Sequence, residues 1–232
     1  MKNKSHILNC SLLFLISIAS LINLYAVNVE TQDPPNVLLI ICDDLNTDIE
    51  GWGGHPQALT PNISRLMQES ISFKQAHCTI PICAPSRSSF LTGIYPHNSN
   101  NFAFDQWMKN PVLSQSKSLS RYFKDNGYYT LSGGKVLHHN FGGRLSEDID
   151  ESLGRARSPR PKRPMSRPSS WSGAWDWGAY PETDTQMGDI QLAEAAAKAL
   201  KEDFEKPFFM SVGFFRPHVP LLVPPKWFEL YE

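Results

Sequence analysis

Asn36-Val37-Leu38-Leu39-Ile40-Ile41-Cys42-Asp43-Asp44 is the stretch that decides the fold of this chain. Its apolar run has the length and composition of a strand buried on both faces of a parallel sheet. The run ends abruptly in two adjacent carboxylates, and ligands of such sheets bind where the strands end. We therefore expect Asp43 and Asp44 at a functional edge, although an ordinary Asp-Asp turn is the alternative.

Two neighbouring carboxylates repel each other unless a cation lies between them. A hard divalent ion that prefers oxygen ligands would relieve this repulsion. The pair at Asp43 and Asp44 therefore predicts a site for a hard divalent metal ion.

A second apolar strand is predicted over residues 207–215, before Arg216-Pro217-His218-Val219-Pro220. Helical patterns are expected at Ser118 to Asn126 and at Asp189 to Asp203, so strands and helices alternate. The predicted fold is α/β, a doubly wound and mostly parallel sheet flanked by helices, in one compact domain over 36–232.

Length and charge bound the classes of function. The 232 residues are 41% hydrophobic, enough for a substantial core, and the net charge is -1. This balance favours no nucleic acid partner.

Cys83-Ala84-Pro85-Ser86-Arg87 is the most distinctive short motif. The segment from Cys83 to Gly93 is typical of a helix entry, with Pro85 tolerated in the first turn. Cys83 would then lie at the helix N-terminus, which favours a thiolate or the oxygens of an ester anion, and Arg87 at i+4 would share its face. A small buried cysteine without chemistry is the alternative.

The chain resembles the sulfatase family in these two stretches, N-V-L-L-I-I-x-D-D-L and C-x-P-S-R, and in Thr60-Pro61-Asn62-Ile63. Thr60 is expected to cap a helix that begins at Pro61. The resemblance implies an alkaline-phosphatase-like architecture. It also implies that a formylglycine-generating enzyme oxidises Cys83 to formylglycine, whose hydrate attacks the sulfur of an ester. Cys83 would join Asp43 and Asp44 at the metal, which the resemblance implies is calcium, with magnesium as the alternative.

Two further segments extend the resemblance. Gly134-Lys135-Val136-Leu137-His138 is similar to the family's G-K-x-x-H, which implies catalytic roles for Lys135 and His138 with Arg87, and substrate contact for Lys135. His139 makes the choice of histidine less secure. Residues 207–220 resemble the branch that includes iduronate-2-sulfatase, which implies that His218 binds the substrate sulfate; a histidine merely rigidified by its prolines is the alternative.

The resemblance covers only the N-terminal part of a sulfatase catalytic domain, at 36–232. The family's further metal-binding acids and second lysine have no clear counterpart after Asp44, so we expect a truncated domain with weak metal binding and little turnover. A sulfuric ester hydrolase acting on a sulfated carbohydrate is predicted. The alternatives are a phosphoester or phosphonate hydrolase of the same superfamily, and a non-catalytic fragment that only binds sulfated glycan.

The N-terminal segment 1–27 is predicted to be a signal peptide or an N-terminal anchor, with a linker at 28–35. We therefore expect an exported protein that is periplasmic, secreted or lumenal. It would contact a membrane only if the segment is not cleaved. Its removal leaves Cys42, Cys78 and Cys83, an odd number that suits modification of one of them. Cys42 and Cys78 would then pair or stay buried.

A basic, proline-rich loop is expected at 154–170. Its cations are Arg155, Arg157, Arg160, Lys162, Arg163 and Arg167, and the aromatic residues after it are Trp171, Trp175, Trp177 and Tyr180. A solvated loop with aromatic packing beneath it is one interpretation. Attraction and stacking of a polyanionic glycan is the other.

Overall fold

The computed structural model describes residues 33–104, 106–138, 144–155, 157–166 and 175–231. The chain divides between Pro34 and Pro35 into two units, and the account below concerns the second, Pro35–Glu232. The predicted signal segment and most of the linker lie outside the described residues. Among the residues that are described, no helix is long and apolar enough to cross a membrane.

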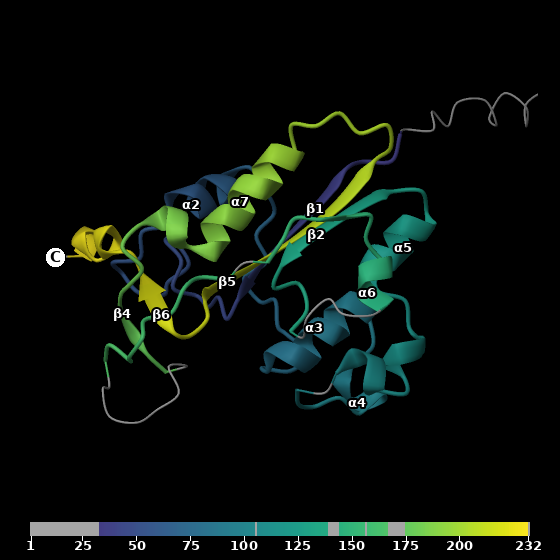
Figure 1. Ribbon diagram of the computed structural model, residues 1–232, viewed down its shortest axis with the longest axis horizontal. Helices are drawn as coiled ribbons and strands as arrows, with labels where there is room; N and C mark the ends of the chain where they lie inside the picture. Colours follow the sequence, from purple (N-terminus) through teal and green to yellow (C-terminus); the bar gives the residue numbers. More distant parts are fainter. Residues whose placement is uncertain (1–32, 105, 139–143, 156, 167–174, 232) are drawn as a thin grey trace, which may run out of the picture. The chain divides into compact units, whose positions relative to one another are not determined.

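A four-stranded parallel sheet forms the centre of this unit (Figure 1). Its order is β1-β5-β2-β3, from β1 (Val37–Asp43), β5 (Phe208–Pro217), β2 (Tyr129–Gly134) and β3 (Glu151–Ser152). All three pairings are parallel. The predicted α/β sheet is confirmed, and the carboxyl ends of β1, β5 and β2 meet at one edge.

Helices cover both faces of the sheet, as expected for a doubly wound fold (Figure 1). The helix α7 (Gly188–Ala199) packs Leu192 and Ala196 against Met210 and Val212 of β5. On the opposite face α5 (Leu119–Asp125) contributes Phe123, whose ring stacks on that of Phe209 at 4.2 Å between centroids. Successive residues of β5 thus pack into hydrophobic cores on opposite faces of the sheet.

β1 departs from the prediction of a strand buried on both faces. Leu38 and Ile40 are 42% and 53% exposed, because β1 lies at the sheet edge and α7 packs on β5 and β2. Of the residues in β1 only Asp43 is buried. The sequence predicts a buried apolar middle for β1, whereas the structure exposes Leu38 and Ile40 and buries the polar residue at the end of the strand, Asp43.

The helix boundaries show which terminal signals act. Ser118 caps α5 by accepting a hydrogen bond from the backbone N–H of Arg121 at 3.0 Å. Thr60 stands before α2 (Pro61–Gln68) but makes no capping hydrogen bond, because its hydroxyl accepts from the backbone N–H of Glu50. That part of the capping prediction is wrong, whereas Pro61 in the first turn is confirmed.

The remaining elements are short. They are α3 (Cys83–Thr92), α4 (Pro96–Ser99), α6 (Arg144–Glu147), the strands β4 (Trp177–Ala179) and β6 (Leu221–Val223), and the 3₁₀ turns η1 (Trp107–Lys109), η2 (Leu113–Gln115), η3 (Asp184–Gln186), η4 (Pro225–Trp227) and η5 (Glu229–Tyr231). β4 and β6 pair in parallel as a separate two-stranded sheet. This small sheet anchors the chain that follows His218.

Candidate functional site

Three neighbouring strands bring predicted site residues to one edge of the sheet. Asp43 ends β1, Lys135 directly follows β2, and His218 follows β5. The pairing of β1 with β5 shifts register between Cys42 and Asp43. Such an irregularity re-aims a side chain, and here it accompanies the turn of the Asp43 carboxylate into the protein.

The Asp43 carboxylate is the centre of the site. One oxygen accepts from Arg87 Nη2 at 2.7 Å, and the other forms a short ion pair with Lys135 Nζ. The three residues are 4%, 3% and 8% exposed, so each charge depends on the others. Burial would raise the pKa of Asp43, but the hydrogen bonds and charges of Lys135 and Arg87 outweigh it and hold that pKa below its usual value.

Arg87 is also held by backbone. Its Nη1 donates to the carbonyl oxygens of Lys135 and Val136, the latter at 3.2 Å. The helix α3 positions Arg87 one turn after Cys83, which is the first residue of that helix and is half-buried. Gly93 ends α3 with φ 73°, in the left-handed conformation predicted for a glycine stop.

Cys83 and Arg87 line a pocket of about 660 Å³ together with Asp43, Asp44 and His218. The predicted nucleophile precursor, arginine, acids and sulfate-binding histidine are therefore in one cavity. Lys135 reaches this cluster through its ion pair with Asp43.

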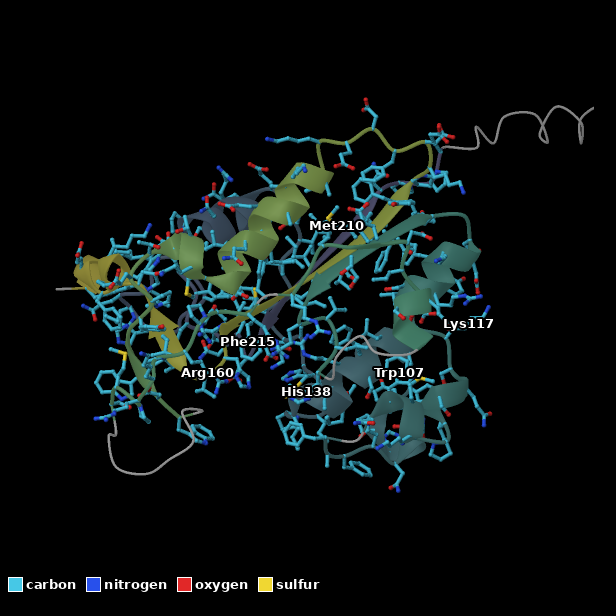
Figure 2. All side chains as sticks on the ribbon, in the orientation of Figure 1. Trp107, Lys117, His138, Arg160, Met210 and Phe215 are labelled. Carbon is cyan, nitrogen blue, oxygen red and sulfur yellow. The ribbon has the colours of Figure 1, made fainter. Side chains whose placement is uncertain are left out.

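His218 faces Asp43 with its Nε2, at 3.9 Å from the second carboxylate oxygen. Its Nδ1 is 2.6 Å from the carbonyl oxygen of Val219, which only accepts, so Nδ1 carries the proton. Lys135 and His218 both contact the ring of Phe215, which lies toward the carboxyl end of β5 beyond Met210 (Figure 2). Lys135 Nζ lies 4.3 Å from the Phe215 ring centroid, and the His218 ring lies edge-on at 5.4 Å.

His138 does not line the pocket. Its ring packs against Phe104, which does line it, with 5.0 Å between centroids. The structure therefore places His138 behind the pocket wall, one residue away from direct contact. The neighbouring His139 lies outside the described residues.

The predicted metal site is incomplete among the described residues. Asp44 lies beside Asp43 on the pocket wall, with φ 64°, but both oxygens of Asp43 already contact Arg87 and Lys135. Within the described ranges, no three histidine, cysteine or acidic side chains are grouped closely enough to hold a metal ion. Two carboxylates fall short of the six to eight oxygens that calcium takes, so these residues alone do not fit a complete site.

Cys42 and Cys78 also line the pocket, and this was not predicted. Both are free thiols, so the proposed pairing is not formed; Cys78 is exposed and Cys42 is half-buried. Burial, with the nearby charge of Asp189, raises the pKa of the Cys42 thiol. Their positions in the sequence could have indicated this, since Cys42 directly precedes Asp43 and Cys78 lies five residues before Cys83.

The basic loop is partly organised by Asp176. This buried carboxylate accepts from the backbone N–H groups of Met165 and Ser166, which lower the pKa of Asp176 to about 2. Trp175 and Trp177 are 66% and 61% exposed, so the interpretation of aromatic packing beneath a loop is wrong for them. Trp175 lines the pocket.

Arg167 and Trp171 lie outside the described residues. The described cations Arg155, Arg157, Arg160, Lys162 and Arg163 are all exposed. Whether they bind a glycan stays a prediction.

Known proteins share both the sequence and the fold of this chain. The sulfatase family model matches residues 35–232. A sulfatase of Formosa agariphila is 36% identical over 216 residues, which cover 86% of this chain and 42% of that protein. Iduronate 2-sulfatase of Homo sapiens is 33% identical over 227 residues, which cover 87% and 38%.

The solved structure of the phosphonate monoester hydrolase of Agrobacterium radiobacter superposes with a TM-score of 0.63 at 20% identity, over 86% of this chain and 44% of that one. This likeness concerns the fold, and it agrees with the predicted alkaline-phosphatase-like architecture. The chain spans less than half the length of each of these three proteins. Because the family model covers the whole of the second unit and both sequence relatives are sulfatases, the chain belongs to the sulfatase family.

Proposed function

We propose that this chain carries the nucleophile half of a sulfatase active site, and that the enzyme hydrolyses a sulfate ester of a carbohydrate. The observation that supports this most directly is the position of Cys83. It begins α3 in the pocket, one helical turn before an arginine that is buried against Asp43. The names of the relatives, a uronate sulfatase among them, support a sulfated carbohydrate as the substrate class.

Formylglycine made from Cys83 would supply a hydrated aldehyde as nucleophile, and a bound calcium or magnesium ion would polarise the ester. Asp43 and Asp44 would provide two ligands of that ion, with the group at position 83 beside them. Within the described ranges, no third histidine, cysteine or acidic side chain groups with them to complete such a site.

The residues of the chain have roles that follow from their placement. Arg87 presents a planar set of donors and Lys135 a point charge, and both suit the oxygens of a transferring sulfate group. His218, with its proton on Nδ1, leaves Nε2 free to accept or pass a proton toward the pocket. His138 would act from behind Phe104 by orienting that wall.

A phosphonate or phosphoester hydrolase is the second candidate, because Arg87 and Lys135 do not by themselves distinguish sulfate from phosphonate oxygens. Rates on an aryl sulfate and on the matched aryl phosphonate would separate the two. A protein that only binds sulfated glycan would bind the glycan but hydrolyse neither of these two esters.

The decisive test is the chemical state of Cys83. The chain is co-expressed with a formylglycine-generating enzyme, which we propose as its maturation partner in an exported compartment, and digested with trypsin. Cys78 and Cys83 lie in the same tryptic peptide, which ends at Arg87, so fragment ions must locate the modification. An aldehyde at Cys83 and an intact thiol at Cys78 are expected.

A Cys83→Ala variant provides the matched control, since it keeps Cys78 in the same peptide. If a reference sulfatase is converted in the same cells and Cys83 stays a thiol, the proposed catalytic role is contradicted.

A further inference from the structure

Asn101 is a buried polar residue that the proposed chemistry does not use. It is 1% exposed and lies on the chain that leaves α4, thirteen residues after Ser88 of α3. The two helices α3 and α4 lie side by side (Figure 1). Asn101 Nδ2 donates to the hydroxyl of Ser88 at 3.1 Å, and this hydrogen bond is buried. It therefore ties the loop after α4 to the helix that begins with Cys83.

A second hydrogen bond continues into the first turn of α3. The hydroxyl of Ser88 donates to the carbonyl oxygen of Pro85 at 3.0 Å, so toward Asn101 it acts as an acceptor. Pro85 is fully buried, and Ser88 is 5% exposed. This relay of two hydrogen bonds reaches the middle of the segment between Cys83 and Arg87 from the interior of the protein.

The loop that contains Asn101 also provides a wall of the pocket. Phe104 lies three residues after Asn101, and it lines the pocket together with Cys83 and Arg87. The preceding residue, Asn100, ends α4 in the left-handed conformation with φ 54°, which asparagine adopts more readily than most residues. A displacement at Asn101 would therefore move the helix that carries the nucleophile precursor relative to the pocket wall.

The side-chain amide of Asn101 is only half satisfied. Its Oδ1 is buried without a hydrogen-bond partner among the described residues. An unpaired buried acceptor is costly, and an apolar side chain of the same shape would avoid that cost. Stability alone therefore favours leucine at this position. A polar residue that departs from this rule beside a candidate active site indicates a role in placing its neighbours.

We propose that Asn101 is a positioning residue for the group at position 83 and for Arg87. It acts through Ser88 on the first turn of α3, and its role rests on the proposed function because it concerns the same pocket. The N-cap residue of α3, Ile82, makes no side-chain capping hydrogen bond, so the start of this helix lacks the usual restraint. The relay from Asn101 supplies a restraint from below, and reacting groups need to be held to within fractions of an ångström.

Three free cysteines line the pocket, and their reactivities report which part of the protein loosens. Cys83 lies on α3, Cys42 lies on β1, and Cys78 precedes the helix. The chain is produced without a formylglycine-generating enzyme, so that Cys83 is a thiol, and is treated with iodoacetamide far below its urea midpoint. Peptide mass spectrometry with fragment ions gives the alkylation rate of each cysteine. The proteins are the unaltered chain, the variants Asn101→Leu and Ser88→Ala, their double variant, and Asn98→Ala, which alters an exposed asparagine of α4.

Asn101→Leu should raise the alkylation rate of Cys83 relative to that of Cys42 about fivefold, the factor that corresponds to one hydrogen bond of about 1 kcal/mol. Ser88→Ala should have an effect at least as large, because it removes both hydrogen bonds of the relay. The double variant should match Ser88→Ala alone, since the two side chains act along one path. Asn98→Ala should leave all three rates unchanged.

An equal acceleration at Cys42 and Cys83 would show a general loss of stability and overturn the positioning role. An unchanged rate at Cys83 in Asn101→Leu would overturn it too, as would effects of Asn101→Leu and Ser88→Ala that multiply in the double variant. Failure of the proposed function looks different. In that case the unaltered chain is not converted at Cys83 by the formylglycine-generating enzyme, a step in which the thiol assay has no part.

Discussion

Replacing Asp43 with asparagine is expected to destabilise the folded chain strongly, since this carboxylate is the counter-charge of two buried cations. Arg87 and Lys135 contact opposite oxygens of Asp43, and all three side chains are at most 8% exposed. The amide of asparagine keeps the shape but removes the charge. Both cations would then remain in the interior without compensation.

Removing one partner of a buried ion pair costs about 3–5 kcal/mol. Domains of this kind are stable by about 5–15 kcal/mol, so the loss would be a large share of the total. Asp44→Asn is the matched control, because Asp44 is the neighbouring carboxylate but is exposed and makes no ion pair with a described residue. That change is expected to stay within about 0.5 kcal/mol.

Urea unfolding followed by circular dichroism would measure both variants. A double variant that adds Lys135→Met to Asp43→Asn should recover part of the loss, because it removes one of the stranded cations. The pKa of Asp43 is held below its usual value, so its contribution is present above the ordinary pKa of aspartate and is lost as the pH falls through the lower folded value. If Asp43→Asn and Asp44→Asn destabilise equally, or if the double variant is less stable still, the reasoning is refuted.

Three further outcomes are expected. Gly213→Ala should unfold the chain or displace the segment after β2, because an added Cβ would collide with the backbone of Lys135 and Val136. Gly127→Ala, at φ 87° with open space around it, should cost only about 1 kcal/mol. Thermal and urea unfolding would compare the two variants, and similar losses of stability would contradict the reasoning. Ile40→Thr should reduce self-association in analytical ultracentrifugation with little change in stability, because this side chain is 53% exposed on the edge strand. Unchanged association would contradict a role of the exposed face of β1 in contacts between copies of the chain. Iodoacetamide should modify the exposed Cys78 well before Cys42, whose pKa is raised by burial, and peptide mass spectrometry showing the reverse order would exclude that ranking.

Local patterns were enough to place most of the elements and the residues at their ends. The apolar run before Asp43, the proline and glycine that bound α3, and Ser118 as the cap of α5 all act within a few residues, so they are visible in the sequence. The same holds for the alternation of strands and helices that produced the doubly wound sheet.

The partners within the site were not visible in this way. Asp43 meets Arg87 and Lys135 across separations of 44 and 92 residues, and parallel pairing of β1, β5 and β2 sets those distances. The resemblance indicated which residues matter, but not that both oxygens of Asp43 are engaged or that His138 stands behind Phe104.

The sequence by itself determined the family, the strands that end at the site, and the placement of Cys83 at a helix start with Arg87 one turn later. Only the tertiary structure decided that β1 is an exposed edge, that the Phe215 ring contacts both Lys135 and Arg216, and that both oxygens of Asp43 are engaged. The physical reason is one of range. Hydrophobic period and capping act over a few residues, whereas burial and charge pairing depend on which distant segments the sheet brings together.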